Sequence, residues 1–135
     1  MAERSVIVID EDINKRVAVE LKSRGRRAFA VSELGLKGSS DPALLPALRD
    51  HDDLANHPWV LVSGDDAMPH DHSELLAQLG VTLATIDPRQ PDELLQDSWR
   101  RDVVHRWAHA MQEQEAGSIR RYSAHRNAAW KPRRR

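Results

Sequence analysis

The stretch that decides the fold is SVIVI at residues 5–9, followed directly by three acids, DED, at residues 10–12. A short β-branched run that is apolar on both faces predicts a central strand of a parallel sheet. Ile13, Val17 and Leu21 then recur at the spacing of one helix face. The beginning of the chain therefore predicts a buried strand that leads into a helix, with acidic residues at the junction.

The next eighty residues repeat this alternation of strand and helix. Apolar runs predict three more strands, at residues 28–31, 59–62 and 81–86. Asp41-Pro42 predicts a helix start, with Asp41 as its N-cap, and residues 69–79 predict another helix. The order of elements predicts an α/β fold over residues 1–96, a three-layer α/β/α domain with a mainly parallel sheet of four or five strands.

Residues 97–116 predict a long amphipathic helix. Its apolar side chains recur every fourth residue, at Trp99, Val103, Trp107 and Met111, with Val104 and Ala108 beside them. We expect this stripe to cover the core of its own domain or to dock a partner.

Residues 117–135 hold seven basic residues and no acid, within a chain of 135 residues whose formal net charge is −1. We expect a mobile tail that could attract RNA phosphates, contact an acidic protein surface or only aid solubility. The candidate nucleic-acid-binding residues are Arg120, Arg121, Arg126, Lys131, Arg133, Arg134 and Arg135.

Composition excludes several classes of function. Cysteine is absent, which rules out disulfides, thiolate metal sites and a cysteine nucleophile. No apolar run is longer than that of Val6–Ile9, which is too short to cross a bilayer, and no signal peptide is evident. We therefore expect a cytoplasmic protein with no membrane partner. No glycine-rich phosphate-binding loop of the known kinds occurs.

The acids fall where the carboxyl ends of parallel strands meet, which is where sites form in such sheets. Asp10, Asp65 and Asp66 follow two predicted strands, and Asp41 opens a helix. Gathered carboxylates repel one another unless they are solvated or bind a hard cation such as Mg²⁺. A bound Mg²⁺ can activate water to attack a phosphodiester. Each acid taken singly could instead be a helix cap or a solvated side chain.

Three segments carry a resemblance to a known family: VIVIDED at 6–12, LGLKGSSD at 34–41 and WVLVSGD at 59–65. Together they resemble the PIN-like nuclease domains, and within these the short bacterial branch related to VapC-type toxins of toxin–antitoxin pairs. The resemblance covers about residues 5–90, and its middle segment is the most specific.

The resemblance implies a fold, a reaction and partners. Asp10, Asp41 and Asp65 match the metal-binding and catalytic acids, and Glu11 matches the acid that follows the first of them. Asp66 could supply a further metal ligand, although the family often has its next acid at the position of Ala67. The implied activity is a Mg²⁺- or Mn²⁺-dependent endoribonuclease of a type II toxin–antitoxin pair, inhibited by a cognate antitoxin and often homodimeric.

Two alternatives remain open. Asp65-Asp66-Ala67-Met68-Pro69 also resembles the phosphoacceptor segment of response-regulator receiver domains, with Asp65 as the phosphorylated residue, although no Lys occurs between Lys37 and Lys131. The other alternative is a non-catalytic PIN-like module that binds RNA or protein. His70 and His72 do not face the same way on a helix, so we expect them at a surface or a helix start.

Overall fold

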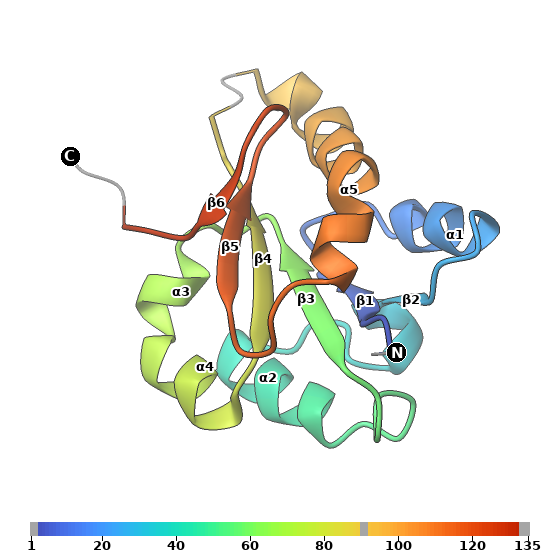
Figure 1. The fold of residues 1–135 in the computed structure, drawn as a ribbon, viewed down its shortest axis with the longest axis vertical. Coiled ribbons are helices and arrows are strands. Elements are labelled where there is room, and N and C mark those ends of the chain that lie inside the picture. The colour runs from blue at the N-terminus through green and yellow to red at the C-terminus, as the bar shows by residue number, and fades with distance from the viewer. Residues whose placement is uncertain (1–2, 90–91, 133–135) are drawn as a thin grey trace.

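The structure, a computed structural model, describes residues 3–89 and 92–132 (Figure 1). Its strands are β1 (Val6–Ile9), β2 (Ala28–Ala30), β3 (Trp59–Ser63), β4 (Thr82–Ile86), β5 (Ile119–Tyr122) and β6 (Asn127–Ala129). Across these two described ranges they form one six-stranded sheet in the order β2-β1-β3-β4-β5-β6. All neighbours are parallel except β5 and β6, which form an antiparallel hairpin.

Helices cover both faces of this sheet. One face carries α1 (Arg16–Ser23) and α5 (Gln96–Gln112), and the other carries α2 (Asp41–Arg49), α3 (Met68–Asp71) and α4 (Ser73–Leu79) (Figure 1). Two short 3₁₀ helices complete the elements, η1 (Val31–Leu34) and η2 (Glu93–Leu95). The prediction of an α/β fold with a mainly parallel sheet is confirmed, with six strands instead of four or five.

The strand β1 is apolar throughout because it is covered on both faces. Ile7 and Ile9 pack into the core beneath α1 and α5, whereas Val6 and Val8 pack into the core beneath α2 and α4. All four side chains are almost fully buried. Successive side chains of a strand point to opposite faces, so an uninterrupted apolar run is the pattern that a doubly covered central strand requires.

Helix α5 packs on the sheet of its own chain. Val103, Val104, Ala108 and Met111 are buried in the core that α5 shares with α1. The flanking Trp107 is partly buried, and its indole N–H donates to the carbonyl of Ser123 at 2.7 Å. No helix in the described part of the chain has the length and apolar character needed to cross a membrane.

The prediction of a mobile tail is wrong for residues 119–129, which form β5 and β6. Tyr122 is fully buried, and its hydroxyl donates to Gln114 Oε1 at 2.9 Å. Burial raises the pKa of this hydroxyl to about 12. The basic composition suggested a tail in place of a strand. Arg120 and Arg121 are compatible with a strand because they donate to Asn127 and Asp66, partners that the sequence pattern does not predict.

Candidate functional site

The predicted acids lie at the carboxyl edge of the sheet, where the strand order reverses. From β1 the chain passes to β2 on one side and then to β3 on the other, so the crevice between β1 and β3 is the topological switch point. Asp10 directly follows β1, and Asp65 lies two residues after β3. Ligand sites of open α/β sheets form at this location.

Asp10 is half-buried in this crevice. Its Oδ1 accepts a hydrogen bond from the backbone N–H of Glu11 at 2.8 Å. Loss of hydration raises the pKa of Asp10 to about 6, and the charges of Asp12 and Asp41 add to the effect. Hydrogen bonds from Glu11 and Ser63 oppose the shift without cancelling it. The ionised form of Asp10 is therefore held at a cost in free energy.

Asp41 is the first residue of α2, and Ser40 occupies the N-cap position where the sequence predicted Asp41. The Ser40 side chain makes no cap hydrogen bond, and Oδ2 of Asp41 lies 3.5 Å from Nε2 of His72. Burial raises the pKa of Asp41, the nearby His72 lowers it, and the charge of Asp65 raises it further. His72 therefore lies beside a candidate site acid, half-buried just before α4.

Asp12 is fixed against the end of β3 by two contacts. Its Oδ1 accepts from the N–H of Gly64 at 3.0 Å, and its backbone carbonyl accepts from Arg100 of α5 at 2.6 Å. A Cβ on Gly64 would lie 2.7 Å from Nε of Arg100, so a larger residue there would displace this guanidinium. Desolvation raises the pKa of Asp12, Gly64 and Arg100 lower it, and the charge of Asp65 raises it.

Asp65 is the fourth member of this acidic cluster, and its charge acts on Asp12 and Asp41. Its Oδ1 accepts from the N–H of Ala67 at 3.0 Å, and its own N–H donates to Ser63 Oγ at 3.0 Å. The carboxylate contributes to the raised pKa of both Asp12 and Asp41. Asp10, Asp12, Asp41 and Asp65 are thus one mutually repelling group, although they come from three separate segments of the chain.

Glu11, a predicted catalytic acid, instead accepts a hydrogen bond from the backbone N–H of Gly38. This contact ties the end of β1 to the loop before α2, and the side chain is exposed. The loop brings Asp41 to the crevice. Glu11 is therefore placed to position this loop.

Asp66, a predicted metal ligand, is engaged by a different set of groups. Arg121 of β5 donates to both of its carboxylate oxygens, each at 2.7 Å, and Thr85 of β4 donates at 3.0 Å. The indole N–H of Trp130 lies 3.1 Å from the Asp66 carbonyl and 3.2 Å from its Oδ1. Adjacent residues thus have different surroundings, with Asp65 among acids and Asp66 anchoring the C-terminal hairpin.

A groove of about 710 Å³ lies beside the crevice, and Asp12 and Asp65 of the repelling group line it, whereas Asp10 and Asp41 do not. Acids contribute to its wall at Asp12, Asp65 and Asp66, and cations at Arg100 and Arg121. Trp130 adds an aromatic surface, and the guanidinium of Arg121 lies 5.4 Å from the centre of its ring. A groove with this lining offers donors for phosphate oxygens and acceptors for a cation in one place.

The predicted nucleic-acid-binding cations are distributed unevenly. Arg120 donates to Asn127 within the hairpin, at 2.6 Å, and Arg121 pairs with Asp66. Arg126 and Lys131 line a smaller groove beside the first. The remaining three, Arg133, Arg134 and Arg135, lie outside the described residues.

Sequence reasoning missed Arg100, Arg121 as an acid partner, and His72. Arg100 and Arg121 reach the crevice from α5 and β5, far along the chain from the acids they approach. His72 sits on a neighbouring connection, and its spacing to Asp41 has no recognisable pattern. The only signal was an excess of Arg in the last third of the chain, and it does not identify partners.

The cluster matches a hard divalent cation in its donor chemistry. Carboxylate oxygens are the ligands that Mg²⁺ and Mn²⁺ prefer, and a cation among them would relieve the repulsion that raises the pKa of Asp10, Asp12 and Asp41. Among the described residues, no three His, Asp or Glu side chains are placed closely enough to bind one ion together. An ion here would keep several of its waters, as Mg²⁺ commonly does.

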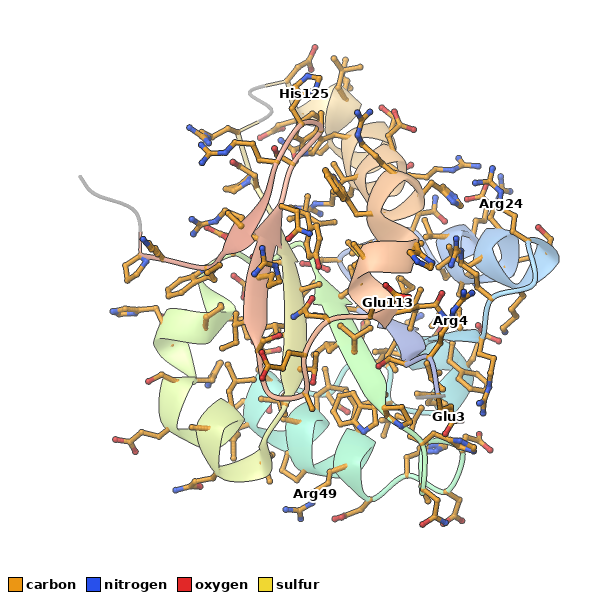
Figure 2. The ribbon with its side chains drawn as sticks, in the orientation of Figure 1. Glu3, Arg4, Arg24, Arg49, Glu113 and His125 are labelled. Carbon is orange, nitrogen blue, oxygen red and sulfur yellow. The ribbon has the colours of Figure 1, made fainter. Side chains whose placement is uncertain are left out.

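A second, larger cavity of about 980 Å³ lies at the opposite edge of the sheet. Glu3, Arg4, Arg49 and Glu113 of its lining are labelled in Figure 2. Glu3 pairs with Arg27 and Glu113 lies 3.2 Å from His109, and none of the residues at the switch point lines this cavity. The carboxyl edge therefore remains the stronger candidate despite its smaller groove.

Comparison of the chain with protein-family models, with curated proteins and with solved structures finds no significant match. The site must therefore be interpreted from its own geometry and chemistry.

Proposed function

We propose that this protein is a divalent-metal-dependent endoribonuclease with a PIN-like three-layer fold. The observation that carries the proposal is the convergence of Asp10, Asp41 and Asp65 at the switch point of the sheet, where no arginine of residues 3–89 and 92–132 forms an ion pair with them. Perturbed carboxyl groups that gather beside a groove, as these do, are typical of functional sites. The fold alone would not support this choice, since one fold supports many activities.

In the proposed reaction, Asp10, Asp41 and Asp65 would hold Mg²⁺ or Mn²⁺, directly or through water. Such an ion would supply a lowered pKa of water and a positive charge to offset negative charge on phosphorus. Water oxygen bonds to phosphorus, and the bond from phosphorus to the leaving ribose oxygen breaks. Arg100 lines the groove together with Asp65, and its guanidinium can bind a phosphate oxygen there and position the substrate. Glu11 acts indirectly by holding the loop that carries Asp41.

The proposed biological role follows from the resemblance of the three motif segments to VapC-type toxins. The substrate is RNA, and a cognate antitoxin protein inhibits the enzyme. A homodimer is part of the same proposal. An antitoxin that inserts a basic side chain among Asp10, Asp41 and Asp65 would neutralise the cluster without a metal.

A receiver domain phosphorylated on Asp65 is the second candidate. The order β2-β1-β3-β4-β5 matches the doubly wound arrangement found in flavodoxin-like folds, which include receiver domains. The cations in the groove are Arg100 and Arg121, whereas the receiver family uses a Lys. A non-catalytic PIN-like binding module would share the fold and lack both activities.

Cleavage of end-labelled RNA with Mg²⁺ or Mn²⁺ tests the proposal. We expect Asp10→Ala and Asp65→Asn to lower the cleavage rate by at least about 10²-fold, because losing a ligand should exceed the effect of losing a residue that only supports one. EDTA should abolish cleavage. Asp52→Asn is the matched control, since Asp52 is exposed in the loop before β3.

Cleavage that persists in EDTA, or at the wild-type rate in Asp10→Ala, would overturn the metal-dependent mechanism. Incorporation of label from a radioactive acyl phosphate into the wild type but not into Asp65→Asn would establish the receiver reading instead.

A further inference from the structure

A second groove, of about 310 Å³, lies on the C-terminal hairpin beside the acid crevice. Four cationic side chains line it: Arg89, Arg121, Arg126 and Lys131. The acid Asp87, Ser123 and the small residues Ala128 and Ala129 contribute the rest of its lining. Arg121 lines both grooves, so the two are contiguous.

Two of these cations are already balanced by carboxylates. Arg89 forms a forked pair with the buried Asp87, with its closest contact at 2.8 Å, and Arg121 pairs with Asp66 in the same way. Arg126 and Lys131 are exposed on the hairpin and its extension. This second groove therefore carries net positive charge, in contrast to the acid cluster beside it.

Trp130 stands at the boundary between the two grooves. Its indole is held in place by the two contacts to Asp66 and by the guanidinium of Arg121 near its ring. The ring is only partly buried, and it lines the acid groove. A fixed, partly exposed indole is a surface on which a nucleobase can stack, with a gain of about 1–3 kcal/mol per base in known single-strand binders.

We propose that the second groove is a phosphate subsite for a single-stranded nucleic acid whose reacting bond lies at the acid crevice. This inference rests on the proposed function and adds the path of the substrate. The strand passes from the acids across Trp130, and its next phosphates bind Arg126 and Lys131. Repelling carboxylates cannot retain a phosphate chain by themselves, so flanking cations must supply the affinity.

An acidic polypeptide is the competing occupant, because glutamate chains also carry closely spaced negative charges. The stacking surface at Trp130 and the adjoining acids favour a nucleic acid. Stacking requires aromatic bases, and the acids would repel an acidic peptide that extended into the first groove.

The test measures binding by fluorescence anisotropy, with the full chain in EDTA and a labelled single-stranded RNA, across a series of salt concentrations. The double variant Arg126→Gln/Lys131→Gln removes the two cations of this groove that form no ion pair within the described part of the chain. We expect it to weaken binding about tenfold near 0.1 M salt and to reduce the slope of log affinity against log salt by about 1.4, since each phosphate contact on a single strand contributes about 0.7.

The matched control is Arg16→Gln/Arg106→Gln, which removes the same charge from exposed positions on α1 and α5. We expect this control to bind RNA within about twofold of the wild type. Equal weakening by both double variants would overturn the subsite, because it would indicate attraction to overall charge alone. Displacement of RNA by polyglutamate at equal charge concentration would also overturn it, and would identify an acidic protein as the ligand.

The two proposals can fail separately. RNA binding in EDTA that is weakened by Arg126→Gln/Lys131→Gln but not by the control, with no cleavage under any divalent metal, would retain the subsite and remove the nuclease. Metal-dependent cleavage by the wild type, with unchanged RNA binding and KM in Arg126→Gln/Lys131→Gln, would retain the nuclease and remove the subsite.

Discussion

Carboxylates have opposite surroundings in two regions of this molecule, the seam between α1 and α5 and the carboxyl edge of the sheet. On the seam between α1 and α5, Glu20 accepts hydrogen bonds from Arg101 and, at 3.0 Å, from His105. These bonds lower the pKa of Glu20 to about 2. At the carboxyl edge, the pKa of Asp10 rises to about 6, because lost hydration and neighbouring acids outweigh its hydrogen bonds.

The difference separates carboxylates that stabilise the folded state from carboxylates that destabilise it when they ionise. A carboxylate whose pKa is lowered adds stability when it ionises, whereas one whose pKa is raised subtracts stability. Glu20 needs only its structural role to explain its surroundings. The acids at the carboxyl edge lower the stability of the folded protein when they ionise. Binding of a ligand or catalysis at this edge would explain why they are present.

The largest expected effect distinguishes Asp66 from its neighbour Asp65. Asp66→Ala should lower the free energy of unfolding by about 2–4 kcal/mol, because it leaves the half-buried guanidinium of Arg121 unpaired and removes an acceptor for Trp130. Urea denaturation followed by tryptophan fluorescence measures the loss. Asp66 would then belong with Glu20, as a group that stabilises the fold.

Asp65→Ala is the matched comparison. We expect a change below about 1 kcal/mol, because the loss of the bond from Ala67 is offset by relief of the charges on Asp12 and Asp41. Equal losses in the two variants would mean that the neighbouring acids do not differ in role.

Asp10→Asn should have the next largest effect, in the opposite direction. The variant should be more stable than the wild type by about 1–3 kcal/mol at pH 7 without metal, since an amide carries no charge and can still accept from the N–H of Glu11. The folded state holds its proton up to pH about 6, against an ordinary value of 3.8. The wild type therefore loses stability relative to the variant as pH rises through this interval, and the difference is absent below it.

Denaturant curves from pH 3.5 to 7.5 measure this difference, with Asp52→Asn as a control that should show no such trend. Mg²⁺ should then stabilise the wild type more than Asp10→Asn, because a cation relieves the repulsion only where the charge is present. A variant that is less stable than the wild type at pH 7 would show that Asp10 has no unrelieved charge.

Much of the fold could be predicted from residues 5–86, because strands covered on both faces produce continuous apolar runs such as Val6–Ile9. The strands β5 and β6 were missed because both are short, β5 contains two adjacent Arg, and β6 has the sequence NAA, which lacks β-branched and aromatic residues. Their stability comes from pairing with β4, burial of Tyr122 and the ion pair of Arg121 with Asp66. These are contacts between segments far apart in the sequence, and local strand propensity does not predict them.

The rule about parallel strands predicted Asp10 and Asp65 at one edge of the sheet, and the resemblance of the motif segments added Asp41. In the structure the charges of these three acids act on one another at this edge. The sequence could not separate Asp65 from Asp66, because the direction of each side chain depends on the turn that follows β3. Nor could it place Arg100, which approaches Asp12 only after α5 packs across the sheet. Topology is accessible from a strand pattern, whereas the pairing of charges between distant segments is not.

The smallest expected effect is that of Glu20→Gln on the seam between α1 and α5. It should lower the free energy of unfolding by about 0.5–1 kcal/mol at pH 7, because solvent screens much of this partly exposed network. The stabilisation by Glu20 is fully present above its ordinary pKa of 4.5 and is lost as pH falls toward about 2, so the difference from the variant should shrink over that range. Glu74→Gln, at an exposed position early in α4, is the control and should show no such dependence. A difference that instead grew as pH fell would mean that Glu20 resembles Asp10, and the contrast between the two regions would be lost.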